Sequence, residues 1–370
     1  MNTLIQRLYL SLICIFRLIK MSQKSALVIG ECFSDNVGDQ AIAAAMREAL
    51  EDRGYFVRNV DYTCRLKKSS NVSKAVSNRI WRDFKHKIRL LIGVFWAIKA
   101  FPIIRDVAIK KYDLVVVGGG QLIFDNAKFP IALYLWIKLL EKNNSNINIF
   151  SCGVNESFCW IEKILIKKAL QLSRGIYFRD FRSIENARRN FGVNAKYCPD
   201  IAYYLYKKTA LRHDVKSGSV MGLSVIDYRV YIRHAGEMSV IPLSELEYIN
   251  EWTVFVVSHV EAGSNVALLS TTENDYMFAE QVFARVKNIC GHRVALYPKP
   301  NSWEDFIDQL SSCNSLLSGR MHGLVLAHIS GVRPIAYLVN KKVETFSNEY
   351  LNKPVEIILL NIELALKEMN

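Results

Sequence analysis

The chain has 370 residues, of which 51% are apolar, and this is enough for two domains with cores of ordinary size. Its 48 Lys and Arg residues outnumber its 35 Asp and Glu residues, and the net charge of +13 favours anionic partners over cationic ones. The positive charge is dispersed and no recognised nucleic-acid-binding module is present, so we expect no nucleic-acid partner.

Residues 1–20 form a basic amphipathic segment, in which apolar residues are interspersed with Arg7, Arg17 and Lys20. The stretch between Arg7 and Arg17 is too short to span a bilayer, and it lacks the small-residue cleavage site of a signal peptide. Two interpretations are open. The segment is a helix lying on a membrane surface, or translation starts at Met21 and the first twenty residues are not native.

The first half of the remaining chain alternates strand-like and helix-like patterns, which is typical of an open, mostly parallel α/β sheet. The continuous apolar run after Asp113 indicates a strand covered on both faces. The predicted strands are Ala26–Gly30, Tyr55–Val60, Asp113–Val117, Ile147–Phe150, Gly175–Phe178 and Ala195–Cys198, and the predicted helices are Gln40–Arg53, Ile131–Lys142, Ile161–Leu172 and Ser183–Phe191.

The loop after the first predicted strand has demanding geometry. Gly38 permits a backbone turn that other residues cannot adopt, and Asp39 is a natural N-cap for a helix beginning at Gln40. We expect Ser34 and Asn36 to face a cleft. The loop has neither the G-x-G-x-x-G pattern of a dinucleotide site nor the lysine of a P-loop.

Three successive glycines, Gly118, Gly119 and Gly120, end the most apolar strand. Glycines at a strand end let the backbone approach a ligand closely. They serve equally well for tight packing against a neighbouring helix. The sequence leaves both interpretations open.

Two further strand ends carry charged residues. We expect Arg179 to point into the cleft, while Asp180 or Ser183 caps the following helix. An ion pair between Arg179 and Asp180 is not expected, because neighbouring strand residues face opposite sides. Pro199 stops another strand and leaves Asp200 at its exit.

Residues Trp81–Ile104 depart from this regular alternation, because they mix lysines and arginines with aliphatic and aromatic residues. Such a basic amphipathic stretch packs against a core or lies on a membrane surface, and both interpretations are open.

The polar stretch Lys208–Gly218 marks a domain boundary, which divides the chain into residues 21–207 and 208–370. A second alternating series follows it. We therefore predict two Rossmann-like domains facing a cleft, which is the default ligand site. In this second series the predicted strands are Val220–Ser224, Thr253–Ser258, Val294–Tyr297, Ser315–Leu317 and Pro334–Leu338, and the predicted helices are Asp275–Lys287, Trp303–Ser311 and Leu324–Ser330.

The most informative motif is S-G-R-M-H-G, residues 318–323, where a short apolar strand turns into a helix. Backbone N–H groups and the helix dipole favour an anion at such a junction. Arg320 adds a fixed positive fork, and His322 adds a group that holds or releases a proton near neutral pH. We therefore predict a phosphate or carboxylate site with acid/base capability here, to which Ser318 and Gly323 belong.

Taken in order, these motifs resemble the polysaccharide pyruvyl transferase family from about Ala26 to Phe346. Each is weak alone, but their order and spacing are specific. The resemblance implies a fold like that of two-domain GT-B glycosyltransferases, with the donor held mainly by the second domain and the acceptor by the first. It also implies transfer of the enolpyruvyl unit of phosphoenolpyruvate onto two hydroxyls of a sugar in a cell-surface polysaccharide, such as a capsule or exopolysaccharide, giving a pyruvate ketal.

By residue, the resemblance implies that Arg179 and Arg320 bind the donor and that His322 is catalytic. The family's lysine corresponds to Lys342, with Lys341 as the alternative because the spacing is one residue longer than usual. Chemistry agrees, because a small donor with a carboxylate and a phosphate calls for arginine forks rather than a metal. A histidine beside the phosphate could supply one proton transfer.

We expect no cofactor or metal. The eight cysteines include no C-x-x-C pair, which argues against zinc and suits a reducing cytoplasm. A lipid-linked or nucleotide-linked glycan is the expected acceptor, and the basic amphipathic stretches favour contact with an anionic membrane surface. Two alternatives are a glycosyltransferase using a nucleotide sugar, with Glu273 or Asp275 as its ribose-binding acid, and a non-catalytic membrane-associated assembly protein.

Overall fold

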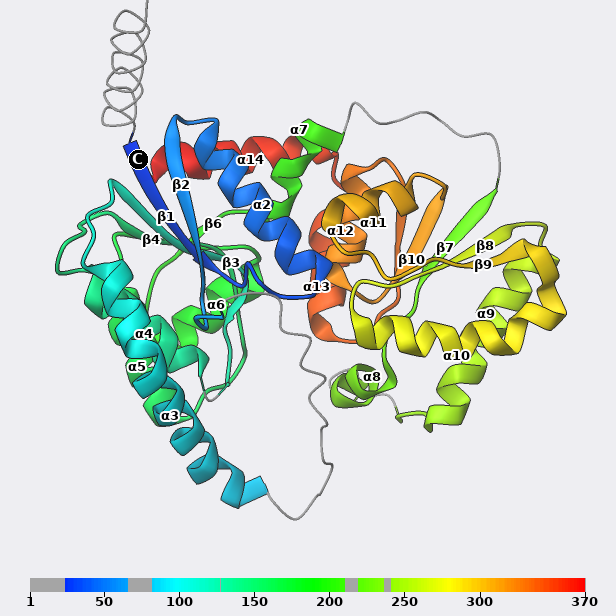
Figure 1. Ribbon diagram of the computed structural model, residues 1–370, viewed down its shortest axis with the longest axis horizontal. Coiled ribbons are helices and arrows are strands. Elements are labelled where there is room, and N and C mark those ends of the chain that lie inside the picture. The colour runs from blue at the N-terminus through cyan, green and yellow to red at the C-terminus, as the bar shows by residue number, and fades with distance from the viewer. Residues whose placement is uncertain (1–23, 66–81, 127, 210–218, 236–240, 370) are drawn as a thin grey trace, which may run out of the picture.

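The computed structural model describes residues 24–65, 82–126, 128–209, 219–235 and 241–369, and for residues 82–90 it describes the backbone alone. In these residues two parallel β-sheets lie side by side, each accompanied by helices (Figure 1). The predicted α/β architecture of two Rossmann-like domains is confirmed. The amphipathic segment at 1–20 and most of the predicted boundary, at 210–218, lie outside the described residues.

The first sheet has the strand order β2-β1-β3-β4-β5-β6, and every neighbouring pair in it is parallel. Its strands are β1 (Lys24–Gly30), β2 (Tyr55–Asp61), β3 (Leu114–Ile123), β4 (Ile147–Val154), β5 (Gly175–Phe178) and β6 (Lys196–Tyr197). The helices of this domain are α2 (Val37–Glu51), α3 (Arg82–Ala108), α4 (Phe129–Leu140), α5 (Trp160–Gln171) and α6 (Phe181–Phe191).

The second sheet has the order β11-β10-β7-β8-β9 and is also parallel throughout. Its strands are β7 (Val220–Ser224), β8 (Asn265–Leu269), β9 (Val294–Leu296), β10 (Ser315–Ser318) and β11 (Arg333–Ala336). The helices that follow β7 in the chain are α8 (Tyr228–Ala235), α9 (Glu245–Glu261), α10 (Glu273–Cys290), the 3-10 turn η5 (Gly291–Arg293), α11 (Trp303–Leu310), α12 (Met321–Ile329), α13 (Lys341–Tyr350) and α14 (Val355–Glu368).

The first sheet is covered on both faces, as its apolar strands predicted. Alternate residues of β1 enter different cores, because side chains alternate across a strand. Ala26 and Val28 join the cluster that contains the buried face of α2, whereas Leu27 and Ile29 join the cluster formed with α3, α4 and α5. With both faces covered, the carboxyl edge of the sheet is where a ligand is expected.

One predicted strand, Thr253–Ser258, is wrong, because these residues lie inside helix α9. Their β-branched and aromatic residues look like a strand in a short window. A capping box of Ser244 and Glu247 starts the helix, and Tyr248, Trp252 and Val256 are buried at a helical spacing. The strand that occupies this place in the sheet is β8, which the sequence pattern missed.

The chain crosses between the two domains twice. It leaves the first sheet through the 3-10 turn η2 (Ile201–Leu205) and α7 (Tyr206–Thr209), and it returns through α13 and α14. Helix α14 packs against η2, with Lys207 Nζ 2.8 Å from Glu363 Oε1 and Lys196 Nζ 2.7 Å from Glu368 Oε2. One continuous buried cluster contains side chains from both sheets, so the two domains share a core.

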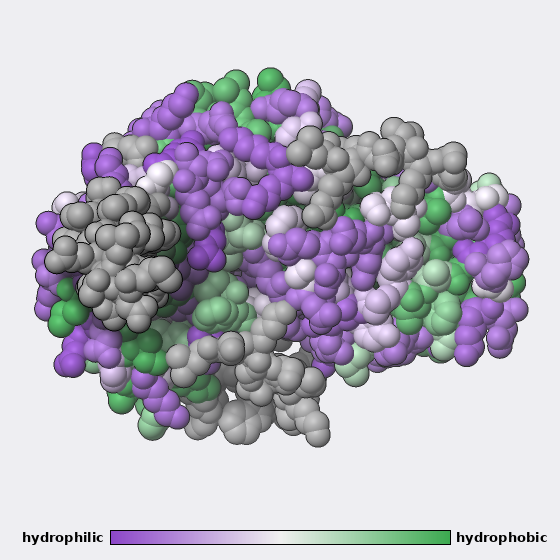
Figure 2. Space-filling model, turned by 45° about the horizontal axis from the view of Figure 1, so that its top comes forward, coloured by the Kyte–Doolittle hydropathy of each residue, from purple (hydrophilic) through white to green (hydrophobic). Residues whose placement is uncertain are grey.

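Helix α3 has two different apolar faces. One face packs Ala100, Ile104 and Val107 into the core of the first domain. Core packing does not account for the other face, because its large apolar residues are exposed: Leu91, Ile92, Val94, Phe95, Ile98 and Phe101. In contrast, hydrophilic residues cover most of the face shown in Figure 2. Among the described residues, no helix combines the length and the apolar character needed to cross a bilayer.

Candidate active site

A pocket of about 700 Å³ lies between the domains. The ends of β3, β4 and β5 and the start of α6 line it from the first domain, and α8, the β10–α12 junction and the start of α13 line it from the second. Cations outnumber anions in its lining, which favours an anionic ligand. These charged residues are Arg179, Arg182, Arg233, Arg320, Lys341 and Lys342, against Asp125, Glu156 and Asp180.

Neighbouring strands of the first sheet end in polar residues that are hydrogen-bonded to one another. Arg179 Nη2 donates to Gln121 Oε1 at 2.7 Å, and Gln121 Nε2 donates to Asn155 Oδ1 at 2.8 Å. Asn155 Nδ2 donates to Asp125 Oδ1 at 2.8 Å. On its other side, Arg179 Nη1 donates to Asp200 Oδ2 at 3.2 Å. We call these five residues the strand-end row.

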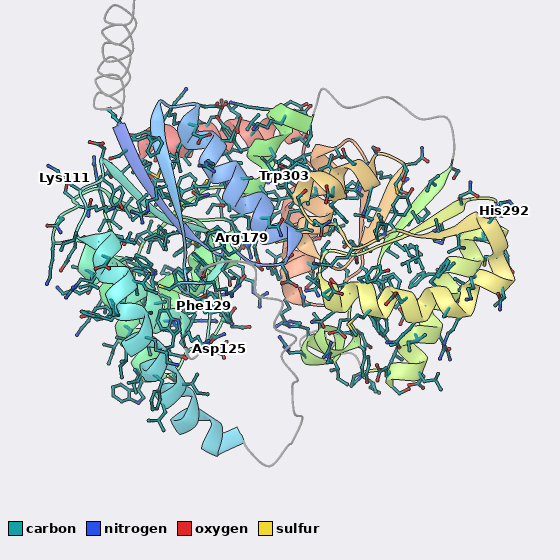
Figure 3. The ribbon with its side chains drawn as sticks, viewed as in Figure 1. Lys111, Asp125, Phe129, Arg179, His292 and Trp303 are labelled. Atoms are coloured by element: carbon teal, nitrogen blue, oxygen red, sulfur yellow. The ribbon has the colours of Figure 1, made fainter. Side chains whose placement is uncertain are left out.

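The backbone explains why the row is continuous. Parallel strands bring their carboxyl ends to one edge of the sheet. Two backbone bonds extend the pairing one residue beyond the strands, from Asn155 N to Ile123 O at 2.9 Å and from Arg179 N to Cys152 O at 3.0 Å. The side chains at this edge are therefore held at adjacent strand spacings, and Figure 3 labels two of these residues, Arg179 and Asp125, on the first domain.

Asp200 is the junction between the row and the second domain. It is 1% exposed, and its Oδ2 lies 3.2 Å from Arg179 Nη1 and 3.3 Å from His322 Nε2. Burial alone would raise the pKa of Asp200, but the attraction of His322 and Arg179 outweighs it and lowers this pKa well below its usual range. Asp200 is therefore an anion that accepts both bonds, so we assign the proton on Nε2 to His322.

His322 also contacts the first domain. A Cβ added to Gly38 would lie 2.5 Å from both Cβ and Nδ1 of His322. Gly38 is thus required because the imidazole packs against it, not because it forms a turn as the sequence suggested. His322 is 9% exposed and, like Asp200, is not among the residues that line the large pocket.

Arg320 lines the pocket but is also paired within its own domain. Its Nε and Nη2 donate to the two carboxylate oxygens of Asp275 at 3.0 and 2.7 Å. Asp275 is fully buried and also accepts from the backbone of Asp227 at 3.0 Å. Asp275 therefore positions Arg320. Glu273, the other acid considered for a ribose, has its Oε2 3.6 Å from Lys299 Nζ.

Ser318 and Gly323 shape the turn that carries Arg320. Ser318 is fully buried, and its Oγ accepts from the backbone N–H of Arg320 at 3.0 Å. A Cβ on Gly323 would lie 2.9 Å from that Oγ. The two residues are not among those that line the pocket, and helix α12 begins at Met321 rather than at the predicted Leu324.

Lys341 and Lys342 both line the pocket, from the first turn of α13, where Asn340 is the N-cap. Lys342 additionally lines a small neighbouring void together with Arg179 and Asp200. Burial and the nearby Arg179 charge lower the pKa of Lys342 to about 7. Of the two candidate lysines, Lys342 is thus the one placed beside the strand-end row.

The expectation that Arg179 and Asp180 would not pair is wrong. Arg179 Nε lies 3.6 Å from Asp180 Oδ2. Strand alternation does not apply, because β5 ends at Phe178 and Asp180 is the N-cap of α6, accepting from Ser183 N at 2.6 Å. The predicted cap itself is confirmed.

The first loop differs from its prediction. Asn36, not Asp39, caps α2, accepting from Gly38 N at 3.0 Å. Ser34 is 8% exposed, and its Oγ accepts from Asn36 N at 3.2 Å. Ser34, Asn36 and Asp39 are not among the residues that line the pocket, although the charge of Asp39 partly offsets the lowering of the Lys342 pKa.

The glycine triplet serves packing. A Cβ on Gly118 would lie 2.2 Å from the carbonyl oxygen of Phe150, and one on Gly119 would lie 2.0 Å from Cγ2 of Ile42. Gly119 and Gly120 also have a φ of 77°, which favours glycine. None of the three lines the pocket, so of the two open interpretations the structure supports tight packing against α2 and β4.

Sequence reasoning missed Gln121, Asn155 and Asp125. Each lies at or just after the carboxyl end of a strand that was predicted correctly, and this position alone could have indicated a ligand site. Asn155 and Asp125 carry no motif, however, and only the sheet order β3-β4-β5 shows that they adjoin Arg179.

The sequence matches one family, described as polysaccharide pyruvyl transferase, over residues 36–340. No curated protein matches it. The fold is similar to that of UDP-GlcNAc 2-epimerase from Methanocaldococcus jannaschii, at 11% identity and a TM-score of 0.51, covering 93% of this chain and 99% of that one. That likeness supports the predicted GT-B-like arrangement of two domains.

Two further solved structures are less similar. UDP-GlcNAc 2-epimerase from Neisseria meningitidis bound to UDP-GlcNAc has 10% identity and a TM-score of 0.48, over 94% of this chain and 99% of that one. An α-glucosyltransferase in complex with UDP and DNA has 9% identity and a TM-score of 0.46, over 94% and 90%.

Proposed function

Because the chain belongs to the polysaccharide pyruvyl transferase family, we propose that it transfers the enolpyruvyl unit of phosphoenolpyruvate onto two hydroxyls of one sugar, forming a pyruvate ketal. The acceptor is a lipid-linked or nucleotide-linked precursor of a cell-surface polysaccharide. The observation that carries the proposal is the cation-rich pocket into which both domains place an arginine from a strand end, Arg179 and Arg320.

The arginines suit a small donor with a carboxylate and a phosphate. Arg179 is 2% exposed, and its buried Nε lies 3.6 Å from Asp180 Oδ2 but makes no hydrogen bond to any described residue. A bound anion would satisfy that group. A guanidinium has five N–H donors, so the two that Arg320 spends on Asp275 leave three for a ligand. Lys342 adds charge beside them, and the donor therefore needs neither metal nor cofactor for its binding.

The reaction joins both acceptor oxygens to the second carbon of the donor. Protonation of the donor's methylene group makes that carbon electrophilic, and the first hydroxyl attacks it. Phosphate then leaves with the C–O bond electrons, and the second hydroxyl closes the ketal. Two hydroxyl protons are lost, of which one is found in the new methyl group and one on the released hydrogen phosphate, so atoms and charge balance.

We propose that His322 carries a proton in this reaction. Asp200 accepts from Nε2, and Nδ1 packs against Gly38 rather than in the large pocket, so proton exchange at Nδ1 requires the Gly38 backbone to move aside. A positioned histidine typically contributes about 10²–10⁴-fold to a rate. The buried Asp200 also links His322 to Arg179, so donor binding and proton transfer are coupled through one carboxylate.

The other functions considered have less support. A nucleotide-sugar glycosyltransferase would need an acid for the ribose, and Asp275 is buried against Arg320. A non-catalytic assembly protein would have no use for the buried network of His322, Asp200 and Arg179. Burying such a polar network costs folding free energy, so a network without a function is not expected.

We further propose that the protein works at the inner face of the cell membrane, where lipid-linked acceptors are found. The exposed apolar face of α3 supports this, since that helix also carries basic residues in sequence, among them Lys99 and Arg105. Such helices bind anionic lipid surfaces through apolar burial and charge together.

The test is incubation with phosphoenolpyruvate and glycan extracts, with measurement of released phosphate and of a mass gain on the glycan equal to pyruvate less water. His322→Ala should abolish turnover and keep phosphoenolpyruvate binding, measured by calorimetry. Arg179→Ala should weaken that binding. Matched controls are His292→Ala and Arg188→Ala, whose side chains are exposed away from the pocket. Transfer of a sugar from a nucleotide sugar with release of the nucleoside diphosphate, or unchanged turnover in His322→Ala, would contradict the proposal.

A further inference from the structure

We propose that the outer part of the strand-end row, Asp125 and Asn155, forms with Phe124 the subsite that binds the acceptor sugar. This inference rests on the proposed function, because it names the part of the same pocket that holds the second substrate. It assigns acceptor binding to three residues that carry no sequence motif.

The three residues converge on one stretch of the pocket wall. Phe124 and Asp125 directly follow β3, Asn155 directly follows β4, and all three line the pocket. Gln121 alone stands between Asn155 and Arg179 in the row, joined to them by bonds of 2.8 and 2.7 Å. A sugar bound at Asp125 and Asn155 would therefore lie next to a donor bound at Arg179.

The charge of the pocket is divided between its two sides. The second domain contributes Arg320, Lys341 and Lys342 around the donor position. On the first domain, Arg182 also lines the pocket but pairs with Glu156 at 3.2 Å, so the described residues of the wall around Asp125 include no unpaired cation and repel a multiply charged donor anion. A hydroxyl-rich neutral ring suits the amide, carboxylate and aromatic groups on this wall, because polar groups orient a ligand over an apolar surface. Its residues are Gln121, Phe124, Asp125, Asn155, Glu156 and Ser157.

The row also fixes how Asn155 and Asp125 are presented. Arg179 can only donate, so it turns the oxygen of Gln121 toward itself and the Gln121 amide group toward Asn155. The Gln121 amide group in turn orients the oxygen of Asn155 toward itself, so the Asn155 amide group donates to Asp125. Each amide therefore has one orientation before any ligand arrives. Such preorganisation reduces the ordering cost of binding. A carboxylate accepts up to about four hydrogen bonds, so Asp125 can accept from sugar hydroxyls as well.

The size of the pocket agrees with two ligands. Pockets of about 300–1,000 Å³ hold drug-sized molecules, and the volume here is about 700 Å³. A three-carbon donor fills a small part of that space. Part of the remainder is lined by Phe124, Asp125 and Asn155, where the proposed subsite is.

The test compares Asp125→Ala with Asp106→Ala, a matched control whose side chain is 76% exposed on α3. Phosphate release is measured while phosphoenolpyruvate and a panel of methyl hexosides are varied in turn. Loss of one charge-assisted hydrogen bond should raise the KM for the hexoside about 10- to 100-fold, with the KM for phosphoenolpyruvate unchanged. Asp125→Asn, which keeps an acceptor oxygen, should show a smaller rise.

Hexoside binding is also measured without turnover, by saturation-transfer NMR on the wild-type protein and on Asp125→Ala. Contact in the wild type that is lost in the variant supports the subsite even if phosphoenolpyruvate is not the donor, so the two proposals fail separately. The subsite is overturned if Asp125→Ala keeps the wild-type KM for the hexoside, or if the wild-type protein contacts no hexoside of the panel. A rise in the KM for phosphoenolpyruvate alone would assign Asp125 to the donor instead.

Discussion

Replacing Asp200 by asparagine should destabilise the protein strongly. The substitution keeps the shape of the side chain but removes the charge that faces both Arg179 at 3.2 Å and His322 at 3.3 Å. Arg179 and Asp200 are 2% and 1% exposed, so water cannot replace the lost partner. Removing one partner of a buried ion pair typically costs about 3–5 kcal/mol. Urea unfolding followed by tryptophan fluorescence should report a loss of that size.

The effect should depend on pH with a definite sign. Because the folded protein lowers the pKa of Asp200, its charge contributes stability above the pKa of a free aspartate, about 4. That contribution is lost as the pH falls toward the lower folded-state value. The difference in the free energy of unfolding between the wild type and Asp200→Asn should thus become smaller at acidic pH. Asp106→Asn, whose side chain is 76% exposed, should change stability by less than about 0.5 kcal/mol. A decrease of less than about 1 kcal/mol in the free energy of unfolding of Asp200→Asn would refute the view that Asp200 compensates the buried charge of Arg179.

Three other outcomes follow from the site. Gly38→Ala places a Cβ 2.5 Å from the ring of His322, so turnover should fall by about 10²-fold or more while phosphoenolpyruvate binding, measured by calorimetry, is kept. Lys342 loses its charge as the pH rises through about 7. The affinity of the wild type for phosphoenolpyruvate should therefore fall across that pH range more steeply than the affinity of Lys342→Met. An equal dependence of affinity on pH in the two proteins would argue against a role for this charge. Phe95→Glu should reduce co-sedimentation with anionic vesicles, whereas Ile241→Glu, at an 88% exposed position outside α3, should not; equal behaviour of the two variants would exclude α3 as the contact.

Much of the fold was predictable because its determinants are local. Short apolar runs indicated ten of the eleven strands in the described residues, and the strand-to-helix junctions at Arg179 and Arg320 were identified correctly. The prediction failed at α9, where a β-branched run was overridden by a capping box and by burial at a helical spacing. It also failed at the start of α2, where two acceptable caps, Asn36 and Asp39, stand three residues apart.

The site was less predictable because its connections are not local. The sequence singled out Arg179, Asp200 and His322 as separate strand or helix ends, and the structure joins them in one hydrogen-bonded network. Residue spacing does not show that Asp275 pairs with Arg320, since 45 positions separate them. Glycines were the hardest to interpret. A glycine is needed wherever no side chain fits, whether the space is taken by a histidine, as at Gly38, or by a ligand.

The return of α14 to the first domain affects how the protein responds to denaturant and to truncation. Since buried side chains from both sheets form one cluster, melting either sheet would expose apolar surface of the other. A single cooperative transition is therefore expected rather than two. Deleting residues from Val355 onward would uncover the apolar surface beneath Ile358 and Ile362 and leave the amino-terminal half prone to aggregation. Neither half of the polypeptide is thus a self-sufficient folding unit.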